Sequence, residues 1–181
     1  PAEFGMLSSL IGLDLSDNHL TGPVPSSVAG NLTSVTYFSL FGNHITGSIP
    51  HEFGNLVNLE TLALSDNLIV GSVPSSIGNM SSLSQILINT NNISGGLPAE
   101  LGNLVNLEII DSYENQLSGP IPQSFGKLVS MREMRLFNNQ LTGSLPSALP
   151  NLTSLVLIEL NDNKLTGHLP DLCQSKMLQV F

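Results

Sequence analysis

A phrase of 24 residues recurs along the chain and constrains its fold more than any other feature of the sequence. It is clearest over residues 128–146, LVSMREMRLFNNQLTGSLP, where apolar residues at set places lead to Asn139, Gly143 and Pro146. The apolar spacing fits neither the period of a helix nor the strict alternation of a strand. Each copy of the phrase therefore predicts one coil of a solenoid.

The seven copies keep a nearly constant register. Their asparagine recurs at a spacing of 25 residues once and 24 residues five times, and a glycine and a proline follow it at fixed distances in every copy. A period in the twenties, with leucine and asparagine in fixed places, is the signature of a leucine-rich repeat. We expect each asparagine side chain to satisfy backbone groups of a turn, so that the seven form a structural ladder. These residues are Asn18, Asn43, Asn67, Asn91, Asn115, Asn139 and Asn163.

Each copy divides into parts by its own chemistry. In the third copy, residues 61–65 alternate with a period of two, which predicts a short strand with Leu62 and Leu64 facing inward. Neighbouring copies would stack these strands into a parallel sheet. Residues 75–80 then predict a short helical or 3₁₀ turn on the opposite, convex side. The one longer spacing comes from an extra residue within 26–31, on this same convex return.

The composition excludes several classes of function. The net charge is −9 and lysine and arginine together number 5, too few for the basic stripe of a nucleic-acid groove. The sequence has no long apolar run, so we expect no membrane contact by this stretch. No nucleophile with a base, paired acids or phosphate-binding loop emerges from the repeat. We therefore expect no enzyme activity, no cofactor and no metal site.

Four Asn-x-Ser/Thr sequons occur along the chain. Such sites fit a secreted protein that carries glycans on its surface. The acceptor asparagines are Asn31, Asn79, Asn92 and Asn151.

The repeat resembles that of the plant-specific leucine-rich repeat family. Residues 56–74, LVNLETLALSDNLIVGSVP, are similar to its form LxxLxxLxLxxNxLxGxIP, and the resemblance covers essentially the whole chain. The resemblance implies an α/β solenoid, a right-handed superhelix with a parallel concave β-sheet, convex 3₁₀ or helical turns and an extra short strand at the Leu-x-Gly segment. It also implies an extracellular location at the plasma membrane. The commonest bearers of this repeat are leucine-rich repeat receptor-like kinases.

The two ends of the chain both fall within a repeat. We expect residues 1–181 to form a single array of seven full repeats, uncapped at both ends, and to be a piece of a longer ectodomain whose anchor lies elsewhere. A kinase domain would also lie outside, because no Gly-rich loop, HRD or DFG motif is present. Cys173, the single cysteine, is expected at the inward position that Ile77 uses, either as a buried thiol or paired with a cysteine of a following repeat.

Three positions of each copy face the concave side. They are the residue before the inward pair, the residue between its two members and the residue after it. Aromatic and apolar side chains gather there beside charged ones, a mixture typical of a protein or peptide interface. The alternative is that the aromatic side chains shield the edge of the core. The candidate ligand-binding residues are Tyr37, Phe41, Leu87, Ile109, Asp111, Tyr113, Glu133, Arg135, Phe137 and Glu159.

Arg135 is the only basic residue in the middle column of this face. Its guanidinium is suited to pairing with a ligand carboxylate. An ordinary cross-strand pair with Asp111 or Glu159 is the alternative.

Three further residues depart from the repeat or recur within it. Ser112 stands where every other copy has an apolar residue, so its hydroxyl is expected to be buried and to find a local backbone acceptor or a water. His19 and His44 occupy the same position in adjacent copies and are predicted to lie about 5 Å apart. Two imidazoles do not make a zinc site, so we interpret them as surface histidines.

These features predict an extracellular ligand-recognition module of a plant receptor-like kinase, non-catalytic in itself. Its partners would be a secreted peptide or protein ligand and a co-receptor ectodomain, bound through the concave or lateral surface. One alternative is a secreted cell-wall inhibitor of the polygalacturonase-inhibiting type, and another is a passive structural scaffold. An ice-binding surface is disfavoured, because Val70, Ser94 and Ser118 interrupt the threonines that precede the repeat glycine.

Overall fold

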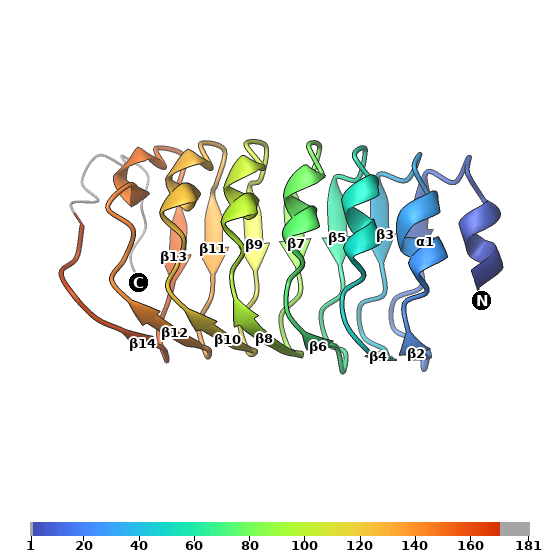
Figure 1. Ribbon diagram of the computed structural model, residues 1–181, viewed down its shortest axis with the longest axis horizontal. Helices are drawn as coiled ribbons and strands as arrows, with labels where there is room; N and C mark the ends of the chain where they lie inside the picture. Colours follow the sequence, from blue (N-terminus) through green and yellow to red (C-terminus); the bar gives the residue numbers. More distant parts are fainter. Residues whose placement is uncertain (1, 171–181) are drawn as a thin grey trace.

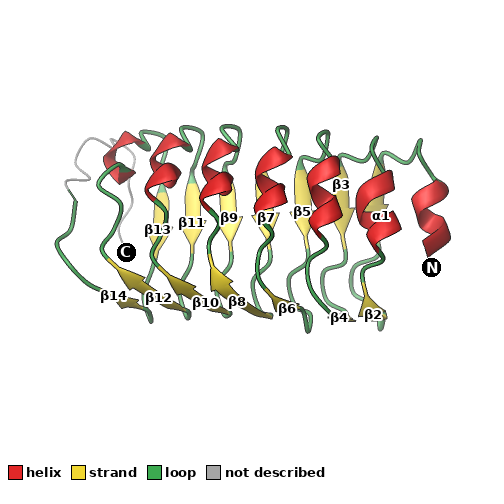
Figure 2. Cartoon of the chain, in the orientation of Figure 1, coloured by secondary structure: helices red, strands yellow, loops and turns green. Residues whose placement is uncertain are grey.

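The computed structural model describes residues 2–170, which form one continuous stack of coils (Figure 1). A long sheet lies on one side of the stack, short helical turns lie on the other, and a second row of short strands follows one edge (Figure 2). The α/β leucine-rich repeat solenoid expected from the sequence is therefore confirmed. The environment predicted for Cys173 lies outside the described residues.

The long sheet has seven parallel strands, one from each coil. Its register places Gly12 opposite Tyr37 and Tyr37 opposite Thr61, so equivalent positions of successive repeats are direct neighbours. Each coil thus adds one strand to the sheet, and a side chain on the concave face lies next to the side chain at the equivalent position of the next repeat. In spatial order the strands are β1 (Gly12–Asp14), β3 (Tyr37–Ser39), β5 (Thr61–Ala63), β7 (Gln85–Leu87), β9 (Ile109–Asp111), β11 (Glu133–Arg135) and β13 (Leu157–Glu159).

A second set of short parallel strands forms a lateral row at the Leu-x-Gly segments of the repeats. One sheet of two strands and one of five make up this row, and a single bridge between Ser48 and Val70 connects them. The row supplies the extra strand that the resemblance implies. Its strands are β2 (Thr21–Pro23), β4 (His44–Thr46), β6 (Val70–Gly71), β8 (Asn92–Gly96), β10 (Gln116–Gly119), β12 (Gln140–Gly143) and β14 (Lys164–Leu165).

The convex side carries one short helical turn per coil. The longer repeat forms an α-helix of 6 residues, α1, whereas most other coils form a 3₁₀ turn of 5 residues. The inserted residue therefore lies on the convex return and leaves the long sheet undisturbed. None of the helices in residues 2–170 is long and apolar enough to cross a bilayer. The turns are η1 (Ala2–Met6), α1 (Ser26–Asn31), η2 (His51–Asn55), η3 (Ser75–Asn79), η4 (Ala99–Asn103), η5 (Gln123–Lys127) and η6 (Leu149–Asn151).

The inward residues of all the coils pack into one continuous core. Leu62 and Leu64 are buried, as the alternation of the third repeat predicts. Burial of an aliphatic side chain contributes roughly 1.5–3 kcal/mol, whereas ordering one residue's backbone costs about 1–2 kcal/mol. A single coil with about seven such side chains does not offset the ordering of its own 24 residues. Stacking is therefore what stabilises each coil.

The repeat asparagines stand in one column between the long sheet and the lateral row. The Asn67 side chain accepts a hydrogen bond from the Ile45 N–H at 2.9 Å, and its Nδ2 donates to the carbonyl oxygen of Leu40 at 2.9 Å. The same amide nitrogen also donates within its own coil to Leu64 and Ser65. Each described asparagine from Asn43 to Asn163 repeats this arrangement and connects its coil to the preceding one.

Ser112 is completely buried in the column of apolar inward residues. Its hydroxyl has no hydrogen-bond partner among the described residues, so the backbone acceptor is not found. The water, the other expected partner, stays a prediction. The backbone carbonyl of Ser112 takes part in the asparagine ladder, since it accepts a hydrogen bond from Asn139 Nδ2 at 2.9 Å. A buried hydroxyl without a partner costs about 1–3 kcal/mol, which is the reason to expect a water at this position.

Candidate functional site

The ten candidate ligand-binding residues all lie on the concave face, but they form two separate groups. Tyr37 and Phe41 belong to the coil of β3 and are 39% and 37% exposed. The other eight belong to the coils of β7, β9, β11 and β13. Between the groups the coil of β5 presents Thr61, Ala63 and the buried Ser65. The aromatic and apolar track expected from the sequence is therefore interrupted at this coil.

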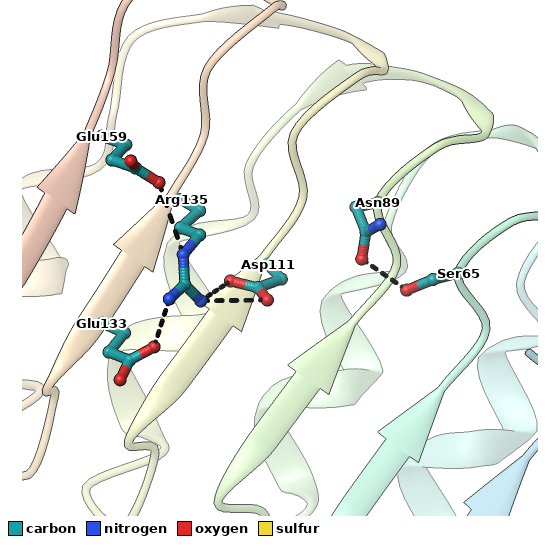
Figure 3. A network of polar contacts seen from close by, with 6 residues as sticks. All are labelled: Ser65, Asn89, Asp111, Glu133, Arg135 and Glu159. Atoms are coloured by element: carbon teal, nitrogen blue, oxygen red, sulfur yellow. Dashed lines mark hydrogen bonds and ion pairs between the residues drawn. The ribbon is translucent and has the colours of Figure 1, made fainter.

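Four charged residues of the second group meet on β9, β11 and β13, three of them as the last residues of these strands (Figure 3). Arg135 Nη1 lies 2.9 Å from Asp111 Oδ1, and Arg135 Nη2 lies 2.6 Å from Glu133 Oε2. Arg135 Nε completes the group at 3.3 Å from Glu159 Oε2. We refer to Asp111, Glu133, Arg135 and Glu159 as the Arg135 cluster.

The strand register explains why these side chains meet. Asp111, Arg135 and Glu159 are direct partners across the three strands, and Glu133 precedes Arg135 by two residues on the same face of β11. Of the two alternatives for Arg135, the cross-strand pair is the one observed, and it involves both predicted acids and Glu133. Three carboxylates around one guanidinium leave a formal charge of −2.

The Arg135 guanidinium is held in its charged form. Burial lowers the pKa of Arg135, but hydrogen bonds and charges from Asp111 and Glu133 outweigh this and raise the pKa above its ordinary value. Each of its three nitrogens already faces a carboxylate. A ligand carboxylate would approach a guanidinium that three carboxylates already surround, whereas a cationic group would find acidic oxygens on an accessible sheet.

An aromatic pair lies beside the cluster. The rings of Tyr113 and Phe137 stack with centroids 4.4 Å apart and planes inclined by 6°, and both side chains are half-buried. Partial burial raises the pKa of the Tyr113 phenol, and the charges of Asp111, Asp66 and Glu114 raise it further. The phenol therefore remains protonated and able to donate a hydrogen bond at physiological pH. The pair offers an apolar platform bordered by negative charge.

A polar network fills the gap between the two groups of candidates. Ser65 Oγ donates to Asn89 Oδ1 at 2.5 Å across adjacent coils, and both side chains are buried (Figure 3). Asn89 Nδ2 then contacts Thr90 Oγ1, which lies 3.2 Å from Glu114 Oε2. The repeat pattern did not predict this network. The occurrence of Ser and Asn in the same column as the aromatic residues is the signal that was available.

Three other predictions concern residues outside this face. The His19 and His44 rings stack at 5.9 Å between centroids, close to the expected separation. Residues 2–170 contain no group of three or more His, Cys, Asp or Glu that is arranged to hold a metal ion. The four sequon asparagines are all exposed, three at the ends of convex turns and one at the start of β8.

Comparison with known proteins agrees with this architecture. The leucine-rich repeat region family matches residues 7–180. The structure of a TDR receptor superposes with a TM-score of 0.95 and 31% sequence identity, over 98% of this chain and 31% of the receptor. No curated protein sequence matches the chain.

Two further similar structures are peptide complexes of plant receptors. The Arabidopsis receptor kinase HAESA, solved with the peptide hormone IDA and the co-receptor SERK1, gives a TM-score of 0.96 at 34% identity over 100% of this chain and 30% of HAESA. PEPR1 with AtPEP1 gives a TM-score of 0.74 at 30% identity, over 100% of this chain and 29% of PEPR1. The chain thus spans less than a third of the length of these structures.

Proposed function

We propose, because the chain belongs to the leucine-rich repeat family, that it is an extracellular peptide- or protein-recognition module of a plant receptor-like kinase. The ligand would bind to the concave face over β9, β11 and β13. The observation that carries the proposal is the stacked Tyr113–Phe137 pair beside the Arg135 cluster, on a sheet face that presents only small side chains at the coil of β5, two coils from β9. The similarity to receptors solved with peptide hormones supports the same proposal.

The arrangement favours a particular kind of ligand segment. The half-buried aromatic pair can accept an apolar or aromatic side chain, and aromatic residues dominate the binding energy of many interfaces. The excess negative charge of the Arg135 cluster favours a lysine or arginine of the ligand, which can also stack on the ring faces. We therefore expect a ligand with a basic residue near an apolar one. A co-receptor ectodomain would join through surfaces outside this group.

The test is the affinity of the chain for a panel of synthetic peptide hormones that includes IDA and AtPEP1. For any peptide that binds, the double variant Tyr113→Ala/Phe137→Ala is expected to weaken affinity about tenfold or more, because loss of a central aromatic anchor typically costs more than 1 kcal/mol. Isothermal titration calorimetry would measure this change.

A matched pair of apolar residues away from the concave face provides the control. Val105 and Val129 are exposed in adjacent coils at the loop that leaves the convex turn. The variant Val105→Ala/Val129→Ala is expected to bind the same peptide with unchanged affinity. Equal affinities for the wild type and the Tyr113→Ala/Phe137→Ala variant would count against the concave site.

A further inference from the structure

One coil of the lateral row differs from the other coils in the side chains that it presents to solvent. In each coil, the residue after the ladder asparagine and the residue two positions later are exposed or half-buried, and an apolar residue stands between them. All the other coils have His, Asn, Gln or Lys at the first position and Thr or Ser at the second. The third coil instead has Leu68 and Val70, which are 52% and 48% exposed on either side of the buried Ile69.

The surroundings of this apolar pair are polar but uncharged. Val70 forms the bridge to Ser48 in the preceding coil and pairs with Asn92 in the following one. Thr46 and Ser94 occupy the positions equivalent to Val70 in these two coils. An apolar centre with a polar rim is the usual layout of a protein interface. The pair therefore marks a candidate interaction surface on the lateral row.

The lateral row lacks negative charge, although the chain as a whole has a net charge of −9. Its strands β2 to β14 all lie within residues 2–170, and they contain no Asp or Glu; Lys164 is their one formally charged residue. In the third coil, Asp66 precedes Asn67 and so lies on the side of the ladder toward the long sheet. Two copies of this acidic chain can therefore meet along the lateral row without opposing the carboxylates that repel each other elsewhere.

The two outward positions of each coil also complement each other. Consider a two-fold axis that runs along the row between them, so that each coil faces the same coil of a second copy and the first position faces the second. Leu68 then faces Val70. In the other coils an imidazole, amide or ammonium group faces the hydroxyl of Thr or Ser, as Asn92 faces Ser94. Apolar groups thus meet apolar groups, and polar groups meet polar ones, along the whole row.

We propose that the lateral row is a self-association surface, on which a second copy of the chain docks about this two-fold axis with Leu68 and Val70 as the apolar contact. A foreign protein would need its own apolar pair at a matching place, whereas a second copy supplies the match by symmetry. The contact uses none of the concave strands. The inference therefore goes beyond the proposed function and does not rest on it.

The size of the row indicates how strong this association is. Coils stack about 4.8 Å apart, so the row is about 29 Å long, and its outward part spans roughly 14 Å along the strands. Each copy thus contributes about 400 Å² of projected area. Interfaces that bury less than about 1,200 Å² in total belong to weak and transient complexes. The expected dimer is reversible and forms only at high protein concentration.

The test is sedimentation equilibrium of the chain made in bacteria, which attach no glycan to Asn92. The protein is expected to show a monomer–dimer equilibrium between about 1 µM and 1 mM. The variant Leu68→Gln/Val70→Thr is expected to weaken dimerisation about tenfold or more, because it removes the apolar centre. Its new side chains are those that other coils have at the same positions, so the fold is expected to be retained. A wild type that stays monomeric, or that forms open-ended oligomers, would overturn the proposal.

A matched pair on another surface provides the control. Val105 and Val129 are 49% and 53% exposed in adjacent coils, on the loop that leaves the convex turn. The variant Val105→Gln/Val129→Thr is expected to dimerise as the wild type does. An equal loss for both double variants would indicate non-specific apolar association and would contradict the two-fold contact.

An independent arm uses the sequon of Asn92, which lies on the row next to Val70. A glycan at Asn92 would separate the two copies, so the glycosylated form of the chain, secreted from a eukaryotic host and verified by mass spectrometry, is expected to be monomeric. Asn92→Gln, which introduces the residue of the next two coils, is expected to restore the dimer in the same host. A dimer that persists with the glycan in place would show that the contact lies elsewhere.

Discussion

Asn67→Asp is expected to lower the free energy of unfolding by about 3–5 kcal/mol, although the two side chains have the same shape. The Oδ1 atom can still accept from Ile45, but the second oxygen then faces the carbonyls of Leu40, Leu64 and Ser65, to which Asn67 Nδ2 now donates. The variant buries a negative charge against three acceptors and leaves them unpaired. Urea or guanidinium denaturation followed by circular dichroism would measure the loss.

The effect of Asn67→Asp should depend on pH in a defined direction. Burial against carbonyls raises the pKa of the new carboxyl in the folded state above its unfolded value of about 3.9. Its protonated form can donate to one carbonyl, so the deficit relative to the wild type is smallest near and below that unfolded value and grows as pH rises through the folded pKa.

Asn58 provides the control for the ladder substitution. It is an asparagine of the same repeat, but it is exposed and makes one hydrogen bond, 2.9 Å long, to the Thr33 carbonyl. Asn58→Asp is expected to cost less than about 1 kcal/mol. A similar loss for both variants would mean that the ladder position has no special role.

Gly102→Ala is expected to destabilise the protein by about 2–4 kcal/mol through a backbone contact on the convex side. A Cβ atom at Gly102 would lie 2.5 Å from the carbonyl oxygen of Ser124 and 2.8 Å from its carbonyl carbon, in the next coil. Because both are backbone atoms, relief requires η4 and η5 to move apart. The change would also open the spacing of the buried core beneath these turns. Thermal and denaturant unfolding both report the effect.

Two other glycines provide comparisons for the Gly102→Ala substitution. A Cβ at Gly30 would meet the Glu52 Cβ at 3.0 Å, a less severe contact than the 2.5 Å at Gly102, so Gly30→Ala is expected to cost less than Gly102→Ala. Gly12 has no heavy atom within 4 Å of such a Cβ, and Gly12→Ala is expected to be neutral. If all three variants had equal stability, coil separation on the convex side would not be set by glycine.

The repeat period determines most of the fold in advance. Because every coil has the same phrase, counting from one asparagine to the next places Tyr37 beside Thr61 and Asp111 beside Arg135, and the strand register agrees. The extra residue of the second repeat converts a 3₁₀ turn into the α-helix α1. The sequence predicts where this change falls, but it does not predict the type of helix. Hydrogen-bond geometry decides the helix type, and it depends on packing against the adjacent coils.

For the candidate site, the sequence predicts which residues occupy equivalent positions on neighbouring strands, but not which of their side chains touch. The register shows that Arg135 has acidic neighbours, but only side-chain conformation decides that its guanidinium faces Asp111, Glu133 and Glu159 together. The burial of Ser65 and its bond to Asn89 likewise depend on the close approach of two coils. The alignment of the repeats shows which residues are neighbours, but it does not give the distances between their side chains.

The proposed function requires that a peptide lies on the concave face over the Arg135 cluster. The direct test is photo-crosslinking with p-benzoylphenylalanine at position 157, which stands beside Glu133 in the register and leaves the cluster and the aromatic pair intact. The same group at position 129, on the loop that leaves the convex turn, is the comparison. Irradiation with the bound peptide should give a covalent adduct from position 157 and none from position 129. An adduct from position 129 alone would contradict the proposed site.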